Sequence, residues 1–423
     1  MIGSIYRLGL VAALAAGLCG AAHGASVVKI EGSHGHWRLV RNGKDYFIRG
    51  AGGVKDIAGF AAMGGNSIRT WGADRAKDDL DRAAEHGVTV MLGFWLGHAE
   101  HGFDYTNEAA LDATLAEILR TVREVKDHDA LLCWALGNEM ELGNPHQEEM
   151  WRFIDRAAEE VKKIDPNHPV CTVVAEVWPD KIEAINRLCP HLDFLGINSY
   201  GGSHSVGERW AAAGKMPYVL TEYGLFGVNE GGATAFGAPF EPTSTAKADW
   251  IAKTYATSIA AYKGTWCLGA YAFVWGVKVE GTPTWHGMLL ANGDILAAAE
   301  TVQTKWGVKK PRNHVPRIEP LSVDRLEVDS PGDTVEVKTA ASDADGDKLT
   351  WRWALIDENG YYGDTGLGGA APKGYKNILA SGKGTGNVKV KLPKEGIFRL
   401  YGYVFDGKGG AAFANVPLKC RGR

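Results

Sequence analysis

The sequence lacks the features that mark several classes of protein. Its 46 lysines and arginines nearly balance its 50 aspartates and glutamates, so the net charge of -4 offers no electrostatic attraction for nucleic acid or an anionic membrane. Beyond the N-terminal segment, no apolar run approaches the roughly 20 residues that a membrane crossing requires. No glycine-rich phosphate-binding motif follows the first predicted strand. We therefore predict no nucleic-acid partner, no transmembrane segment and no cofactor, and no pattern indicates the oligomeric state.

Cysteine is also scarce, with six residues in the chain. Apart from Cys19 near the N-terminus, they are odd in number and widely spaced: Cys133, Cys171, Cys189, Cys267 and Cys420. They form no CxxC pair and no Cys/His ligand pattern, so we predict neither a disulfide framework nor a zinc site. Cys133 and Cys267 stand in apolar runs, where a free cysteine behaves as a small core residue.

The first residues have the pattern of an export signal. Arg7 provides a positive charge, residues 8–18 form a short apolar run, and residues 22–24 (Ala-His-Gly) match a small-x-small cleavage site. A lipoprotein would need a small residue before its cysteine, whereas a leucine precedes Cys19. We predict that residues 1–24 are a signal peptide, that no lipid anchor is attached, and that the mature protein is exported to the periplasm or the extracellular space.

The remaining chain has the composition of a globular protein of enzyme size, with 45% hydrophobic residues and 14 tryptophans. From residue 27 to residue 308, short apolar runs alternate with longer stretches of helical periodicity, which is typical of repeated βα units. Eight strands are predicted, at residues 47–50, 67–70, 88–94, 131–136, 170–174, 194–198, 218–221 and 270–275. Eight units in a segment of this length favour an α/β fold, a closed (β/α)8 TIM barrel, over an open doubly wound sheet.

Two β-rich segments flank the predicted barrel. Before it, alternating residues on either side of Asn42-Gly43 predict a hairpin that caps the barrel floor. After Trp306, three prolines mark a linker and only short alternating strands follow. We predict that residues 311–423 form a small all-β, immunoglobulin-like sandwich behind a barrel domain of residues 25–310. The acidic run at residues 343–347 (Asp-Ala-Asp-Gly-Asp) fits either a calcium site or an Asp/Gly turn, and we assign no metal ligand.

Two glutamates follow predicted strands at the end of the barrel where active sites lie. Glu139 comes shortly after strand four, and Glu222 follows strand seven. The carbonyl groups of a parallel strand point toward this end and repel a carboxylate, so the two residues need a functional reason. Cleavage of a glycosidic bond provides one, because an acid must protonate the leaving oxygen while a second carboxylate meets the charge that develops at the anomeric carbon.

Strands four and seven can place the two carboxyl groups roughly 5 Å apart, the separation at which the second carboxylate attacks the sugar and the configuration is retained. We therefore predict a covalent mechanism with Glu222 as nucleophile and Glu139 as acid and base. A nearby apolar wall and the charge of Glu222 are expected to raise the pKa of Glu139. A salt bridge to an arginine at the barrel rim is the structural alternative for either glutamate.

Two short motifs contain these glutamates: Gly137-Asn138-Glu139 and Thr221-Glu222-Tyr223-Gly224. Supporting pieces are residues 66–71 at strand two, residues 196–200 at strand six and Trp275 at strand eight. Over residues 45–306 the chain resembles clan A glycoside hydrolases, and most closely the barrel domain of glycoside hydrolase family 2. The resemblance implies that Asn138 holds the substrate 2-hydroxyl and that Trp275 forms the floor under the sugar. It also implies that Arg69 and Tyr200 orient the nucleophile.

Other residues in the predicted top-face loops are candidate substrate contacts. They are Trp71 after strand two, His98 after strand three and Glu176 after strand five. A flat indole with one polar N–H suits the apolar faces and polar rims of sugar rings, although a core position is common for tryptophan. Further tryptophans in these loops are candidates for either role: Trp95, Trp178 and Trp285.

These observations predict a retaining β-glycoside hydrolase that acts on a β-linked oligo- or polysaccharide. The jelly-roll and immunoglobulin-like domains that precede family 2 barrels are not seen before this one, which favours an open cleft suited to a polysaccharide. β-Glucan is the first hypothesis for the substrate, followed by β-mannan and β-galactosides. A transglycosylase with the same catalytic pair and a non-catalytic carbohydrate-binding protein are the alternatives.

Overall fold

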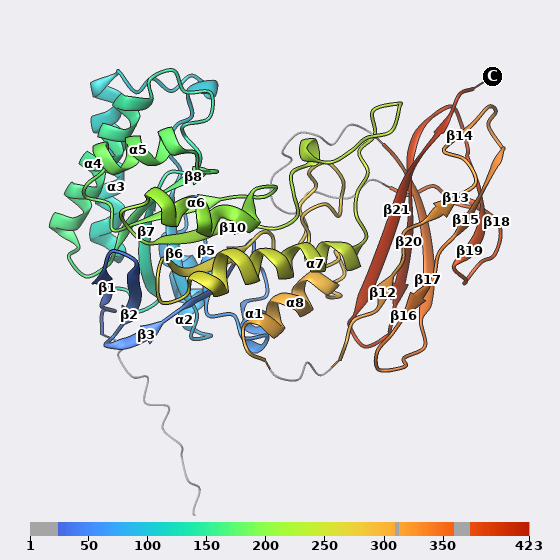
Figure 1. Ribbon diagram of the computed structural model, residues 1–423, viewed down its shortest axis with the longest axis horizontal. Coiled ribbons are helices and arrows are strands. Elements are labelled where there is room, and N and C mark those ends of the chain that lie inside the picture. The colour runs from blue at the N-terminus through green and yellow to red at the C-terminus, as the bar shows by residue number, and fades with distance from the viewer. Residues whose placement is uncertain (1–23, 309–312, 359–372, 423) are drawn as a thin grey trace, which may run out of the picture.

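The computed structural model describes residues 24–308, 313–358 and 373–422. Eight parallel strands close into a barrel in chain order, and the last of them pairs with the first (Figure 1). They are β4 (Ile48–Gly52), β5 (Ser67–Arg69), β6 (Thr89–Phe94), β7 (Leu131–Leu136), β8 (Val170–Ala175), β9 (Phe194–Asn198), β10 (Tyr218–Tyr223) and β11 (Cys267–Ala272). The predicted TIM barrel is thereby confirmed. The predicted signal peptide lies outside the described residues except for Gly24.

A helix follows each barrel strand. The helices are α1 (Ile57–Ala62), α2 (Ala76–Ala84), α3 (Glu108–Val125), α4 (Gln147–Ile164), α5 (Pro179–Leu188), α6 (Val206–Ala213), α7 (Ser244–Thr254) and α8 (Ala297–Lys305). On α3, the apolar stripe of Leu111, Ile118, Val122 and Val125 is buried in the main hydrophobic core. None of the helices in the described residues has the length and apolarity to span a bilayer.

The eighth barrel strand begins and ends at other residues than predicted. β11 begins at Cys267 and ends at Ala272, whereas the sequence pattern predicted residues 270–275. Residues Gly269 to Ala272 pair in parallel register with β4. The chain therefore leaves the sheet before Phe273, and this shift decides where the aromatic side chains that follow lie.

A three-stranded sheet closes the N-terminal end of the barrel. Its strands are β1 (Val28–Ser33), β2 (His36–Arg41) and β3 (Lys44–Tyr46). Asn42 and Gly43 have the φ angles of 51° and 74° that a tight hairpin turn between β2 and β3 requires. Val28 and Leu39 share one buried cluster with side chains inside the barrel. The N–H of Val28 donates to the carbonyl of Asn167, just before β8, at 2.8 Å, so the predicted hairpin does cap the floor.

The C-terminal segment forms the predicted all-β sandwich. One sheet has the order β13-β15-β19-β18, the other has the order β14-β21-β20-β17, and β12 pairs with β16. The strands are β12 (Arg317–Ile318), β13 (Ser322–Val323), β14 (Glu327–Val328), β15 (Thr334–Lys338), β16 (Ala341–Ser342), β17 (Thr350–Asp357), β18 (Leu379–Ser381), β19 (Asn387–Lys391), β20 (Gly396–Phe405) and β21 (Ala411–Cys420). Val335 and Val390 of the first sheet share a buried cluster with Leu400 and Leu418 of the second.

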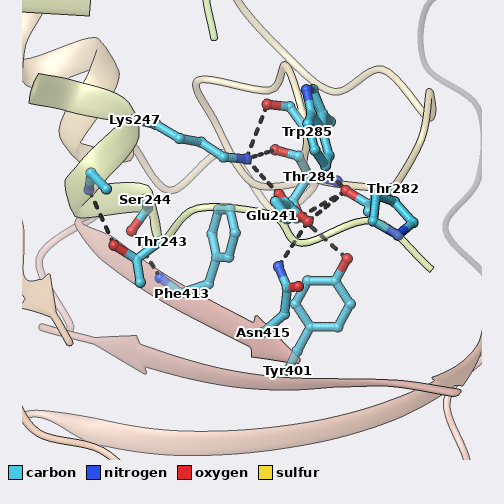
Figure 2. Close-up of polar contacts among 12 residues, drawn as sticks. Glu241, Thr243, Ser244, Lys247, Thr282, Thr284, Trp285, Tyr401, Phe413 and Asn415 are labelled. Atoms are coloured by element: carbon cyan, nitrogen blue, oxygen red, sulfur yellow. Dashed lines mark hydrogen bonds and ion pairs between the residues drawn. The ribbon is translucent and has the colours of Figure 1, made fainter. Parts of the chain in front are cut away.

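A buried polar network joins the sandwich to the barrel (Figure 2). The carboxylate of Glu241, before α7, accepts a bond from Lys247 Nζ of α7 at 2.5 Å and one from Asn415 Nδ2 of β21 at 2.7 Å. The hydroxyls of Thr282 and Thr284, after β11, donate to the same carboxylate, each at 2.7 Å. One carboxylate therefore connects the segments after two barrel strands with helix α7 and the sandwich.

Further bonds fix the same interface. Arg399 of β20 donates to Asn415 Oδ1 at 2.6 Å and to the carbonyl of Pro239 at 2.8 Å. The N–H of Ala411 donates to the carbonyl of Ile295 at 3.0 Å, which links β21 to the segment before α8. Figure 1 shows α7 and α8 between the barrel and the orange and red sandwich.

Two smaller predictions concern cysteine and the acidic run. The five cysteines of the described residues are free and buried, as expected for core residues. In the acidic run, Asp343 Oδ1 accepts the N–H groups of Asp345 and Asp347 at 2.9 and 3.2 Å. Lys408 pairs with Asp347 at 2.6 Å. These are the contacts of an Asp/Gly turn with a neighbouring cation.

Candidate active site

Glu139 lies at a tight bend after β7. Its φ angle is 56°, and its N–H donates to the carbonyl of Val173 in β8 at 2.9 Å. Gly137 has a φ angle of 82°, and a Cβ there would lie 2.0 Å from the sulfur of Met140, so only glycine fits. A left-handed conformation costs a residue with a side chain about 1–3 kcal/mol and is typical of functional sites. The bend is what aims Glu139 at the barrel mouth.

Glu222 lies within β10 and is only 6% exposed. Its Oε1 accepts hydrogen bonds from Arg69 Nη1 at 2.8 Å and from Trp71 Nε1 at 2.7 Å. Its Oε2 accepts one from the Tyr200 hydroxyl at 2.5 Å. All three partners are donors, so they hold a carboxylate in one orientation. Arg69 and Tyr200 thus lie where the sequence motifs implied, and Trp71 contacts the carboxylate directly.

Asn198, the last residue of β9, connects the two glutamates. Its Nδ2 donates to Glu139 Oε1 at 2.7 Å, and its Oδ1 accepts a bond from Arg69 Nη1 at 3.2 Å. Arg69 in turn donates to Glu222, so the side chains of Asn198 and Arg69 connect the two glutamates. Asn138 Oδ1 accepts from Arg69 Nη2 at 2.6 Å and from Asn198 Nδ2 at 3.0 Å. Asn198 has no predicted role from the sequence, although a polar residue at the C-terminal end of a buried strand is a signal for a functional position.

The surroundings of Glu139 favour its protonated form. Burial and then the negative charge of Glu222 raise the pKa of Glu139 to about 7, against the opposing effect of the hydrogen bond from Asn198. Glu141, which pairs with Lys181 at 2.7 Å, adds a smaller contribution in the same direction. The site therefore holds one carboxyl group whose pKa of about 7 leaves a large share of it protonated near neutral pH, beside one that is held by three donors.

Aromatic side chains enclose the donors of Glu222. The Phe273 ring lies 6.0 Å from the ring of Trp71 and 5.8 Å from that of Tyr200, in edge contact with both. His286 lies 5.3 Å from the Tyr200 ring. This wall restricts Trp71 and Tyr200 and so leaves the Glu222 carboxylate little freedom to turn.

Comparison with known proteins identifies the family of the chain. The family model described as "Glycosyl hydrolases family 2, TIM barrel domain" matches residues 53–265. The chain belongs to glycosyl hydrolase family 2. A β-glucuronidase of Pongo abelii is 25% identical over 217 residues, which are 46% of this chain and 32% of that protein. A probable mannan endo-1,4-β-mannosidase A of Aspergillus clavatus is 27% identical over 207 residues, which are 39% of this chain and 57% of that protein.

Solved structures of this kind share the fold. A putative β-galactosidase from Bacteroides fragilis superposes with a TM-score of 0.52 at 14% identity, covering 94% of this chain and 58% of that one. A β-D-glucuronidase of Dictyoglomus thermophilum has a TM-score of 0.51 at 16% identity, covering 68% of this chain and 54% of that one. This family 2 chain thus spans about a third to a little over half of the length of the relatives it matches.

Trp275, predicted as the sugar floor, lies elsewhere in this family 2 barrel. Its side chain is 4% exposed and packs between Phe60 of α1 and Trp306 at the end of α8, with ring centroids 5.3 and 5.7 Å away. This packing corrects the predicted position of Trp275. β11 ends at Ala272, so the regular alternation of strand residues does not extend to Trp275 and does not set the direction of its side chain. Phe273 is the aromatic residue of this segment that reaches the catalytic side chains.

His98 and Glu176 lie near the segment of Glu139 and Asn198, but His98 is buried and Glu176 already has hydrogen-bond partners. His98 is 7% exposed, and neither ring nitrogen has a hydrogen-bond partner among the described residues. Burial lowers the pKa of His98, so its imidazole is neutral at ordinary pH. Glu176 accepts bonds from Ser199 Oγ and Arg209 Nη2, both at 2.6 Å. Both residues border the site, and the predicted direct contact with the sugar stays a prediction.

The remaining candidate tryptophans separate into two groups. Trp285 is fully buried and donates to the carbonyl of Phe226 at 2.8 Å, so it is a packing residue. Trp95 and Trp178 are 56% and 57% exposed. The sequence could not separate these roles, because all three follow barrel strands in loops of similar composition.

A charged group after β11 was missed in the sequence. Burial alone would raise the pKa of Glu280, but His286 and Lys278 outweigh it and lower that pKa to about 2. Lys278 Nζ pairs with Glu280 Oε2 at 2.8 Å and lies 4.8 Å from the Phe273 ring. These residues carry no recognisable motif, and only the folding of the loop over Phe273 brings them to the site.

Proposed function

We propose that this family 2 chain is a retaining β-glycosidase, with Glu222 as the nucleophile and Glu139 as the acid and base. The observation that carries the proposal is the contrast between the two carboxyl groups. Glu222 accepts three hydrogen bonds from Arg69, Trp71 and Tyr200, whereas burial raises the pKa of Glu139 to about 7. A protonated acid beside a fixed, ionised carboxylate is what double displacement at an anomeric carbon requires.

The reaction proceeds in two steps. Glu139 gives its proton to the glycosidic oxygen as that oxygen leaves the anomeric carbon, and a Glu222 carboxylate oxygen forms the new bond to the same carbon. The charge of Glu222 is thereby lost, so the pKa of Glu139 falls and its carboxylate can accept a proton from water. That water attacks the anomeric carbon from the side of Glu139, the bond to Glu222 breaks, and the β configuration is retained.

Asn138 is the proposed contact for a sugar hydroxyl. Its Oδ1 accepts hydrogen bonds from Arg69 and Asn198, which fixes the orientation of the amide. The two N–H groups then lie on the other branch of the amide and serve as donors to a substrate oxygen. A fixed donor of this kind contributes most if its bond strengthens as the transition state forms.

The charges around the site favour a neutral sugar. Cations near the catalytic pair are each held by a carboxylate: Arg69 by Glu222, Lys278 by Glu280, and Arg209 by Glu176. A uronate would have to displace one of these carboxylates to obtain a cation of its own. Among the substrates named for the relatives, we therefore favour a neutral β-linked glycan over a glucuronide, with β-glucan and β-mannan to be tested first.

The test is a panel of nitrophenyl β-glucoside, β-mannoside, β-galactoside and β-glucuronide with β-glucan and β-mannan oligosaccharides. We expect the wild type to cleave a neutral glycan and Glu139→Ala to lower kcat/KM by about 10²–10⁴-fold, with an at least equal loss for Glu222→Ala. Glu108→Ala, at a glutamate whose side chain on α3 is 75% exposed, is the matched control with unchanged rates.

Three other outcomes of the panel would contradict the proposed substrate or the proposed activity. A preference for the glucuronide contradicts the argument from charge, and products longer than the substrate indicate a transglycosylase with the same catalytic pair. Binding of glycan without turnover by the wild type, unaffected by both substitutions, would mean that the barrel is a binding protein.

A further inference from the structure

Two exposed indoles flank the strand that carries the acid/base. Trp95 directly follows β6, and Trp178 follows β8 as the N-cap of α5; both strands are neighbours of β7 in the barrel. Their exposed fractions are 56% and 57%. An exposed indole keeps a large apolar face in contact with water, and a sugar ring stacked on that face would bury it.

Each indole is nevertheless fixed by a group that covers part of it. The Trp95 ring stacks on His98, with ring centroids 5.1 Å apart and 21° between the planes. His98 is itself buried, so it is a rigid support. Because burial lowers the pKa of His98, this support stays uncharged near neutral pH.

Trp178 is supported in a similar way. The guanidinium of Arg209 lies 5.4 Å from the centre of the Trp178 ring. Arg209 is held by Glu176 Oε1 at 2.6 Å, by the carbonyl of Gly202 at 3.1 Å and by the carbonyl of Val177. Several hydrogen bonds therefore hold the cation against the indole, which limits the motion of a large exposed side chain.

The surroundings of Trp95 suit a polar ligand with apolar faces. Trp95 borders a hollow of about 460 Å³ whose lining includes Asp74, Lys77 and Arg120. That volume is within the roughly 300–1,000 Å³ range of small-molecule sites. An aromatic wall with charged and polar groups around it matches a sugar ring, which offers C–H groups on its faces and hydroxyls on its rim.

We propose that Trp95 and Trp178 are sugar-stacking platforms of two subsites beyond the cleavage point. The substrate would then be a β-linked oligosaccharide or polysaccharide whose chain extends past the sugar bound to Glu222, and not a single sugar on a small leaving group. This inference rests on the proposed glycosidase function of the same site. It adds the residues that hold the outlying sugar units and the length of substrate that they select.

The test compares two substrates of the same sugar, a nitrophenyl monoglycoside and an oligosaccharide, in Trp95→Ala and Trp178→Ala. We expect the ratio of kcat/KM for the oligosaccharide to that for the monoglycoside to fall about tenfold in each variant, mainly through KM. Trp95→Phe and Trp178→Phe keep an aromatic face and should recover most of this ratio. Trp351→Ala, at a partly buried indole of the sandwich strand β17, is the matched control with an unchanged ratio.

Two results would overturn the inference. One is a ratio that stays within about twofold of the wild type in both alanine variants, and the other is an equal loss on both substrates. Covalent labelling of Glu222 in the wild type by an activated 2-deoxy-2-fluoro oligosaccharide separates this failure from that of the proposed function. If the label forms and the ratio does not change, the glycosidase proposal stands and the platforms are wrong; if no label forms, the proposed function itself fails.

Discussion

At the scale of single residues, the two glutamates differ in their surroundings and not in their chemistry. Burial and then the charge of Glu222 raise the pKa of Glu139 to about 7. Glu222 is surrounded by donors that orient it. Asn198 connects the surroundings of the two glutamates, because it donates a hydrogen bond to Glu139 and accepts one from Arg69, which binds Glu222. The division of roles thus depends on partners that lie on two other barrel strands, β5 and β9, or directly after them.

This arrangement predicts the alkaline side of the pH profile. Glu139 acts in its protonated form and burial raises its pKa to about 7, so kcat/KM should fall as the pH rises through about 7. Asn198→Ala removes a hydrogen bond that favours the ionised form, so the pKa of Glu139 should rise and this limb should move to higher pH. The measurement is kcat/KM across the pH range for the wild type and the variant.

The control for this pH shift is a variant of an asparagine that lies on a helix outside the site. Asn186→Ala, on α5 at a side chain that donates only to the carbonyl of Ala213, should leave the limb in place. A limb that moves to lower pH in Asn198→Ala would mean that Asn198 does not stabilise the ionised form of Glu139.

At the scale of elements, the alternation of apolar runs and helical periodicity was enough to find every barrel strand. The two candidate catalytic glutamates could be named because the ends of parallel strands meet at one mouth. The limits of β11 could not be derived in the same way, because the residues after the strand are as apolar as the strand itself. Trp275 was misplaced for this reason, and Phe273 was overlooked.

Contacts made by loops were the least predictable part of the site. Glu280 and His286 lie in a segment without regular structure, and only packing against Tyr200 and Phe273 brings it to the nucleophile. The burial of His98 and the exposure of Trp95 also depend on how one loop folds. Sequence patterns report the period of an element, whereas these positions are set by tertiary contacts.

At the scale of the whole molecule, a buried ion pair of the barrel domain lies where the sandwich packs against it. Glu241 and Lys247 have side chains that are 0% and 5% exposed, and Asn415 of the sandwich completes the carboxylate's partners (Figure 2). The segment that binds Glu241 through Thr284 continues to Trp285 and His286, which packs on Tyr200. The sandwich is therefore joined to the wall of the catalytic site and is not a loosely tethered module.

Removing one partner of this pair should destabilise the molecule strongly. Glu241→Ala leaves the Lys247 ammonium buried without its carboxylate, so we expect a loss of about 3–5 kcal/mol in the free energy of unfolding. Urea unfolding, followed by fluorescence and circular dichroism, measures this loss. The two signals should change together in the wild type, because the barrel and the sandwich share one buried interface.

The matched control is Glu336→Ala, which breaks the exposed Glu336–Lys389 pair within the sandwich and should leave the unfolding midpoint unchanged. If Glu241→Ala behaves like Glu336→Ala, the network does not hold the two parts of the molecule together.

The most direct test of the central claim is to trap the covalent intermediate. The protein is incubated with the activated 2-deoxy-2-fluoro glycoside of the preferred sugar, digested, and examined by tandem mass spectrometry. The account predicts one added sugar, attached to Glu222 in the peptide that contains Thr221-Glu222-Tyr223, and slow turnover of the label when an acceptor is added. A label on Glu139, or hydrolysis with inverted configuration and no label at all, would contradict it.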